Sequence, residues 1–333
     1  MSKADAAAAI LWVGATFYAL FGGADFGGGF WDLVAGWDER GQRPRDVIQR
    51  SLTPVWEANH VWLIFVLVVL WTAFPSAFSA IFTTLYVPIA LAALGIVLRG
   101  AGFAFRKSIV GLRERRAMGA TFAISSVLTP FFMGTVVGAI AAGNVPAEGN
   151  GDAFSSWLQP LPLLIGAMFV ASGAYLAAVF LVGDARRGDH EMESYFERRA
   201  LGAAVVAGAL AIAGLFALHS EARYVFDRLT AEGLPLVVLS LLCGAALLIV
   251  LVRGGRRPLR PLAAGAVIAV VWGWGVAQFP YLLPTSLRID QAAAPDATMT
   301  TVFIVFAVAA VVVLPSLGLL YTLAQKDLLE SDH

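Results

Sequence analysis

The sequence is poor in cysteine and in charged residues. Cys243 is the only cysteine among 333 residues, which excludes a disulfide within the chain and any cluster of thiolate ligands. Asp, Glu, Lys and Arg together make up 14% of the chain, whereas a soluble domain carries about 25%. Positive and negative charges balance to a net charge of zero, so no basic surplus favours binding to nucleic acid.

Hydrophobic residues, in contrast, make up 59% of the chain, and the mean hydropathy is +0.77. They gather in blocks about 20 residues long, the length of a helix that crosses a bilayer. We therefore predict an all-α polytopic membrane protein in which residues 1–333 form a single transmembrane domain of about nine helices packed as bundles. The predicted spans are 8–33, 57–75, 78–99, 117–142, 160–183, 200–219, 234–252, 260–282 and 299–324.

Basic residues fix the predicted orientation of these spans. Of the 23 lysines and arginines, 19 fall in connections on one side, and no connection is long enough for a soluble domain. Because positive charge stays on the cytoplasmic side, we expect an extracytoplasmic N-terminus and a cytoplasmic C-terminus. The cations left on the outer side are Lys3, Arg223, Arg228 and Arg288.

Ionisable residues in apolar spans are costly and usually functional. Asp25 lies in the glycine-rich segment FGGADFGGGFWD, roughly 10 Å from the inner edge of the first span, and Asp32 follows seven residues later on the same face. The segment WEANHVW, residues 56–62, opens the second span at the same side. The third span ends at Arg99, with Arg106 two turns beyond.

These residues are predicted to meet at one level of the membrane, because consecutive spans with short connections tend to be neighbours. Glycines around Asp25 remove bulk, so a helix can approach closely or water can enter. The pattern predicts a proton path that opens to the cytoplasm. Its members are Asp25, Glu57, His60 and Asn59, supported by Trp56, Trp62, Arg99, Arg106 and Asp32.

Several alternatives remain open for single residues. Asp25 could pair with Arg99 and only lock two helices together, and Glu57 could be a helix-start charge favoured by the macrodipole. Trp56 and Trp62 could be interface-belt tryptophans, and His60 could be a haem ligand.

Two alternatives concern the whole chain. One is a secondary transporter with Asp25 as its coupling acid. The other is a purely structural anchor subunit.

The ordered motifs of the first third resemble subunit II of the cytochrome bd-type quinol oxidases. The matching pieces, in chain order, are GADFGGG at 23–29, IQRSL at 48–52, TPVWEANHVWLIF at 53–65, TAFPSAFSAIFTTLYVPIAL at 72–91 and LRGAGFAFR at 98–106. The chain departs from the family pattern in having Ala24 where Phe is usual, Glu57 where Asp is common and His60 where Gln or Glu often occurs.

The resemblance implies a subunit of a heterodimer in the plasma (inner) membrane of a prokaryote, which oxidises quinol and reduces dioxygen to water. Haems and the quinol-oxidation site would belong to subunit I, so no cofactor bound directly by this chain is expected. Subunit II would stabilise its partner and provide a proton path, in which Glu57 matches the acid linked to proton uptake and Asp25 is the first-helix acid. A structural quinone, a small accessory subunit and bound membrane lipid are left open.

Overall fold

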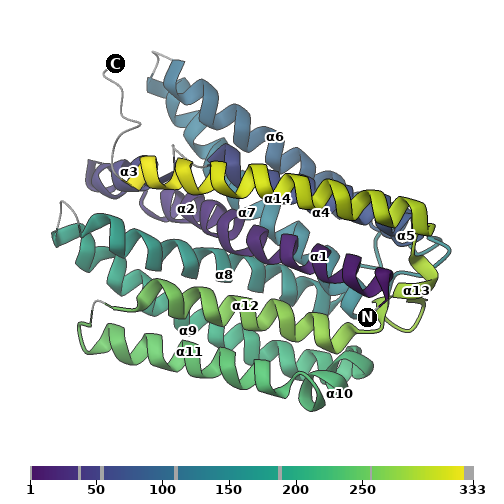
Figure 1. The fold of residues 1–333 in the computed structure, drawn as a ribbon. Helices are drawn as coiled ribbons and strands as arrows, with labels where there is room; N and C mark the ends of the chain where they lie inside the picture. Colours follow the sequence, from purple (N-terminus) through teal and green to yellow (C-terminus); the bar gives the residue numbers. More distant parts are fainter. Residues whose placement is uncertain are drawn as a thin grey trace.

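A computed structural model describes residues 2–36, 39–52, 56–108, 112–186, 190–255 and 257–325. Figure 1 shows long helices lying side by side, with their connections gathered at the two ends of the bundle. These described residues include eight helices long and apolar enough to cross a membrane, or up to nine when a bent pair counts as one span. The predicted all-helical membrane fold is thus confirmed, while the orientation across the membrane stays a prediction.

The first span is one apolar helical segment of 32 residues, Lys3–Val34. It consists of α1 (Lys3–Phe17), a π-helical turn η1 (Tyr18–Gly22) and α2 (Gly23–Val34). Ser2 caps its start, because the Ser2 hydroxyl accepts a hydrogen bond from the Asp5 amide at 3.1 Å. The π-turn inserts extra backbone into the helix, so the face that α2 presents is rotated relative to that of α1.

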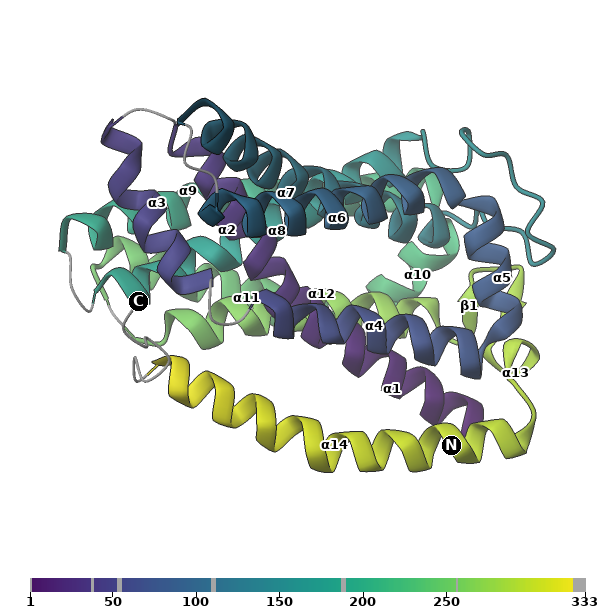
Figure 2. The same cartoon turned by 90° about the horizontal axis from the view of Figure 1, so that it is seen from above.

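Eight further long helices follow, and each overlaps one of the remaining predicted spans. Helix α14 lies along the edge of the molecule beside α1 and α4 (Figure 2). The eight helices are α4 (Trp56–Ala73), α6 (Tyr86–Ser108), α7 (Leu112–Ala141), α8 (Pro160–Ala185), α9 (His190–Glu221), α11 (Leu234–Val252), α12 (Leu259–Gln278) and α14 (Asp296–Gln325).

The third predicted span, 78–99, is wrong in its position. Residues 75–84 form a separate helix, α5 (Pro75–Thr84), which is bent by 116° from α4. The helix breaks at Phe74, where φ is −136° and ψ is 61°, and Pro75 then opens α5 at a position where its missing N–H is not needed. A second break at Leu85 (φ −106°, ψ 28°) ends α5. The third long helix is therefore α6, which continues nine residues beyond Arg99.

Shorter elements connect the long helices. They are α3 (Glu39–Leu52), α10 (Arg223–Ala231), the antiparallel pair β1 (Tyr281–Leu283) and β2 (Leu287–Arg288), and α13 (Ile289–Ala292). Helix α3 packs against α2 and α8 and buries Val47 and Ile48. It lies at the end of the bundle that the arginine pattern predicts to be cytoplasmic, called the inner end below (Figure 1).

Helices α2 and α8 approach so closely that no methyl group fits between them. A Cβ built on Gly27 would lie 1.9 Å from the carbonyl oxygen of Gly173, and one built on Gly173 would lie 2.7 Å from the carbonyl oxygen of Gly23. Both contacts are made with backbone atoms, so no side chain can move aside. The glycine cluster around Asp25 therefore serves close helix packing, one of the two roles that the sequence predicted for it.

We expect Gly27→Ala to destabilise the protein by about 1–3 kcal/mol, the usual cost of overpacking a tight contact. The measurement is thermal unfolding of the purified protein in detergent. Gly208→Ala on α9 is the matched control, because a Cβ at Gly208 meets nothing within 4 Å. Equal unfolding midpoints for the two variants would contradict the packing argument.

Candidate functional site

The candidate site is centred on Asp25, in the first turn of α2. The π-turn ends one residue before α2 begins, and it determines which way the first turn of α2 faces. Gly29, one turn later, would place a Cβ 2.1 Å from the Ser126 hydroxyl oxygen, so α2 also lies tightly against α7. Asp25 is 1% exposed as a result of this packing.

The Asp25 carboxylate makes a two-pronged ion pair with Arg99 of α6. Arg99 Nη1 donates to Asp25 Oδ2 at 2.6 Å, and Arg99 Nη2 donates to Asp25 Oδ1 at 3.0 Å. Nη2 also donates to the Asp25 backbone carbonyl at 3.1 Å. The Arg99 side chain is 2% exposed and the Asp25 side chain is 0% exposed. This fork-to-fork geometry is the strongest form of a charge-assisted hydrogen bond between side chains.

Three further residues complete the surroundings of the guanidinium group. Arg99 Nε donates to the Ser126 hydroxyl at 2.9 Å, and that hydroxyl donates to the carbonyl of Phe122 at 2.6 Å. The Arg99 Cζ atom lies 4.7 Å from the ring centroid of Phe26 and 4.8 Å from that of Phe122. Every guanidinium nitrogen thus has an acceptor, and the aromatic rings stabilise the cation through their quadrupoles.

Both partners of the ion pair lie at the same depth. Asp25 precedes the end of α2 at Val34 by nine residues, and Arg99 precedes the end of α6 at Ser108 by nine. At the rise of an α-helix this corresponds to about 13 Å from each inner helix end. A buried charge at that depth requires the compensation seen here.

Helix α4 adds His60 next to this cluster and buries Asn59 one residue before it. Asn59 is 3% exposed, and the His60 ring centroid lies 6.0 Å from that of Phe26, the residue after Asp25. Trp62 is 9% exposed and stacks on Phe17 of α1, with the ring centroids 4.3 Å apart. Trp62 therefore packs inside the bundle instead of lying in an interface belt.

The structure thus brings Asp25, Arg99 and His60 into one region, and it buries Asn59 on the same helix as His60. Asp32 is 1% exposed on α2. The sequence placed Trp56 and Glu57 at the start of the second span and Arg106 two turns beyond Arg99. The backbones of these three lie in α4 and α6, but their side chains lie outside the described residues.

Sequence reasoning missed the contributions of Phe26, Ser126 and Phe122. Ser126 belongs to a serine pair, Ser125-Ser126, inside an apolar span. That pair is the signal that could have placed α7 beside Arg99, because serine hydroxyls in membrane helices often bridge to neighbouring helices. The two rings gave no such signal, because phenylalanine is common throughout this sequence.

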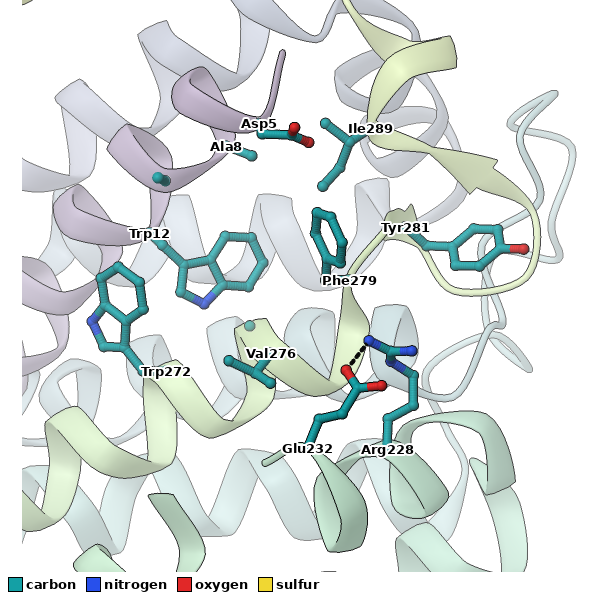
Figure 3. A pocket seen from close by; sticks show the side chains of 12 residues that line it. Asp5, Ala8, Trp12, Arg228, Glu232, Trp272, Val276, Phe279, Tyr281 and Ile289 are labelled. Atoms are coloured by element: carbon teal, nitrogen blue, oxygen red, sulfur yellow. Dashed lines mark hydrogen bonds and ion pairs between the residues drawn. The ribbon is translucent and has the colours of Figure 1, made fainter. Parts of the chain in front are cut away.

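A second concave feature lies at the opposite, outer end of the bundle. It is a cavity of about 240 Å³ between α1, α10, α12 and the β1 strand. Figure 3 shows Trp12, Trp272 and Phe279 in its wall and the Arg228–Glu232 ion pair at its edge. These walls suit an apolar ligand, and the structural quinone left open by the sequence stays a prediction.

Comparison with known proteins gives a consistent result. The family model described as "Cytochrome bd terminal oxidase subunit II" matches residues 4–324. The chain is 20% identical to the "Putative cytochrome bd menaquinol oxidase subunit II" of Bacillus subtilis (strain 168), covering 96% of this chain and 95% of that protein. It is 25% identical to the "Cytochrome bd ubiquinol oxidase subunit 2" of the same organism, covering 84% and 80% of the two chains.

Among solved structures, the bd oxidase from Geobacillus thermodenitrificans contains a similar chain. The TM-score is 0.77 at 23% sequence identity, and the alignment covers 97% of this chain and 98% of that one. This similarity supports the helical arrangement described above.

We expect Asp25→Leu or Arg99→Met alone to destabilise the protein by about 3–5 kcal/mol, since each leaves an unpaired buried charge. The double variant should recover most of this loss, because apolar side chains of similar size can replace a buried pair. A double-mutant cycle from thermal unfolding in detergent measures the coupling.

The control for this cycle is Lys3→Met, which breaks the exposed Lys3–Asp296 pair. It should cost less than about 1 kcal/mol. Additive losses in the Asp25 and Arg99 double variant would show that the two side chains do not depend on each other.

Proposed function

The chain belongs to the family of cytochrome bd terminal oxidase subunit II, and from this premise we propose that it is the haem-free subunit that carries protons from the cytoplasmic side toward a haem-bearing subunit I. Members of this family are subunits of a quinol oxidase, an oxidoreductase complex of the bacterial inner membrane that also contains a subunit I. The proton path and the division of cofactors are the parts that we propose.

The observation that carries the proposal is the buried ion pair of Asp25 and Arg99, with His60 beside it and Asn59 buried next to His60 in the chain. A buried ion pair is weak evidence for stability, because an apolar replacement is often equally stable. Ionisable groups at this depth are usually retained for function, above all in proton relays. The cluster is therefore better explained by a task than by stability alone.

In the proposed path, Glu57 takes up a proton in the first turn of α4, at the inner end of the bundle. His60 lies about one turn deeper and passes the proton on, since one imidazole nitrogen can accept a proton while the other donates one. Asn59 orients water between these groups. Asp25 is the acid at the far end, and Arg99 holds its carboxylate in place.

The haem-free assignment is supported by the distribution of histidines. Haem in a helical bundle is held by axial ligands such as histidine, methionine or cysteine. His60 is the single histidine in the interior of a predicted span, because His190 lies in a connection, His219 at a span end and His333 at the last position of the sequence. One side of the His60 ring faces the aromatic ring of Phe26, with the ring centroids 6.0 Å apart.

We expect Glu57→Gln to slow quinol-driven oxygen consumption on the order of 10²-fold, the lower end of what a positioned acid or base contributes. Assembly with the haem-bearing subunit should be unchanged, because the substitution keeps the shape of the side chain. The measurement is oxygen consumption and proton uptake by the complex in liposomes.

The matched control is Glu114→Gln, the same chemical change at an exposed position near the inner end of α7. It should leave both rates unchanged. Wild-type turnover and proton uptake in the Glu57 variant would exclude the relay and favour a purely structural anchor. The Asp25→Leu, Arg99→Met double variant adds a second criterion, since an anchor predicts full activity once stability is recovered.

A further inference from the structure

Acidic side chains pair with cations at both ends of the bundle, for example in Arg43–Glu191 and Arg186–Glu193 at the inner end. At the outer end, every described cation that the arginine pattern places there has an acidic partner. The pairs are Lys3–Asp296, Arg223–Asp227, Arg228–Glu232 and Arg288–Asp290. The outer surface is thus locally neutral, and it offers no excess positive charge to an anion.

The connection between α11 and α12, at the inner end, is different in composition. Its sequence, RGGRRPLR at 253–260, contains four arginines and no acid. Arg260 turns into the bundle, where Nη2 donates to Asp184 Oδ1 at 2.6 Å and to the Phe180 carbonyl at 2.8 Å. Arg253 and Arg257 are exposed, and neither forms an ion pair with any described residue.

The backbone holds the start of this connection, up to Gly255, in a defined shape. Gly255 N–H donates to the Val250 carbonyl at 2.8 Å, and Gly254 N–H donates to the Leu251 carbonyl at 3.1 Å. With Gly254 at φ 66°, these bonds form a Schellman motif that ends α11 at Arg253. Arg253 therefore extends from a fixed helix end, with Arg257 only four residues further along the chain.

An apolar surface adjoins Arg253. Helix α11 exposes Ile249 (50%) and Val252 (74%) in its last turn. Of the most apolar stretch of α11, within Leu234–Val252, only 11% of the residues are buried against other parts of the chain. The surface thus combines an unpaired cationic edge with an apolar flank, which matches the headgroup and the acyl chains of one molecule.

We propose that Arg253 and Arg257 bind the phosphate of an anionic phospholipid whose acyl chains lie along the exposed side of α11. Guanidinium groups suit this role because they form paired hydrogen bonds with phosphate oxygens. Charge complementarity selects an anionic lipid over a zwitterionic one, since no acid in this connection can neutralise the two arginines.

The test uses the intact complex, purified in mild detergent after incubation with phosphatidylglycerol or phosphatidylcholine. Native mass spectrometry counts the lipid molecules retained. We expect phosphatidylglycerol to be retained by the wild-type complex and its affinity to fall about 30-fold in the Arg253→Gln, Arg257→Gln variant, from about fivefold for each arginine near a membrane surface. Phosphatidylcholine binding should be the same in both.

The control is the Arg223→Gln, Arg288→Gln variant, which removes the same number of exposed arginines from the outer end. It should retain phosphatidylglycerol as the wild type does. If the Arg253→Gln, Arg257→Gln variant retains as much phosphatidylglycerol as the wild type, the proposal is overturned. Release of the lipid by millimolar inorganic phosphate would also overturn it, because it would indicate a phosphate site without acyl-chain contacts. If this variant loses the partner subunit and not the lipid, the surface is a protein interface, and the proposal is overturned as well.

Discussion

The ion pair between Asp25 and Arg99 is the constraint on which the inner half of the bundle depends. A charge on α2 and a charge on α6 are buried together, and either one alone would be costly in an apolar interior. Their meeting requires α2 to lie close to its neighbours, which Gly27 and Gly29 permit. It also requires α7 to bring Ser126 to the remaining guanidinium nitrogen. The packing of these helices and the polar chemistry therefore cannot be varied independently.

Much of this arrangement could be predicted from the sequence, for identifiable reasons. Length and apolarity set the long helices, and glycines beside an intramembrane acid indicated close packing at Asp25. The sequence also offered the Asp25–Arg99 pair as an alternative to a proton carrier, and the structure has that pair. The position of the third long helix could not be predicted, because the break at Phe74 depends on one backbone conformation. Ser126 and Phe122 were missed because their helix is a neighbour in space only.

The pairing of cations with acids differs between the outer end and one connection at the inner end. At the outer end, acids near in sequence or in space neutralise the cations. At the inner end, the connection after α11 contains no acid at all. Arginine counting predicts which side stays in the cytoplasm, but it does not explain why the outer-end cations are paired with acids while Arg253 and Arg257 have no acidic partner among the described residues. The anionic phospholipid that we propose would supply this counter-charge.

The fully paired state of Asp25 limits what this acid can do in a proton path. Both carboxylate oxygens accept hydrogen bonds from Arg99, so a proton on Asp25 would have to bind at a lone pair that the guanidinium does not use. Arg99 also has Ser126 and the aromatic rings of Phe26 and Phe122 as partners, so the cation would remain stabilised if Asp25 lost its charge. His60 lies next to Phe26, and a proton on its imidazole would add positive charge beside Arg99. In the proposed relay, repulsion between these two cations would favour moving the proton onward, a directing role that a simple helix lock would not have.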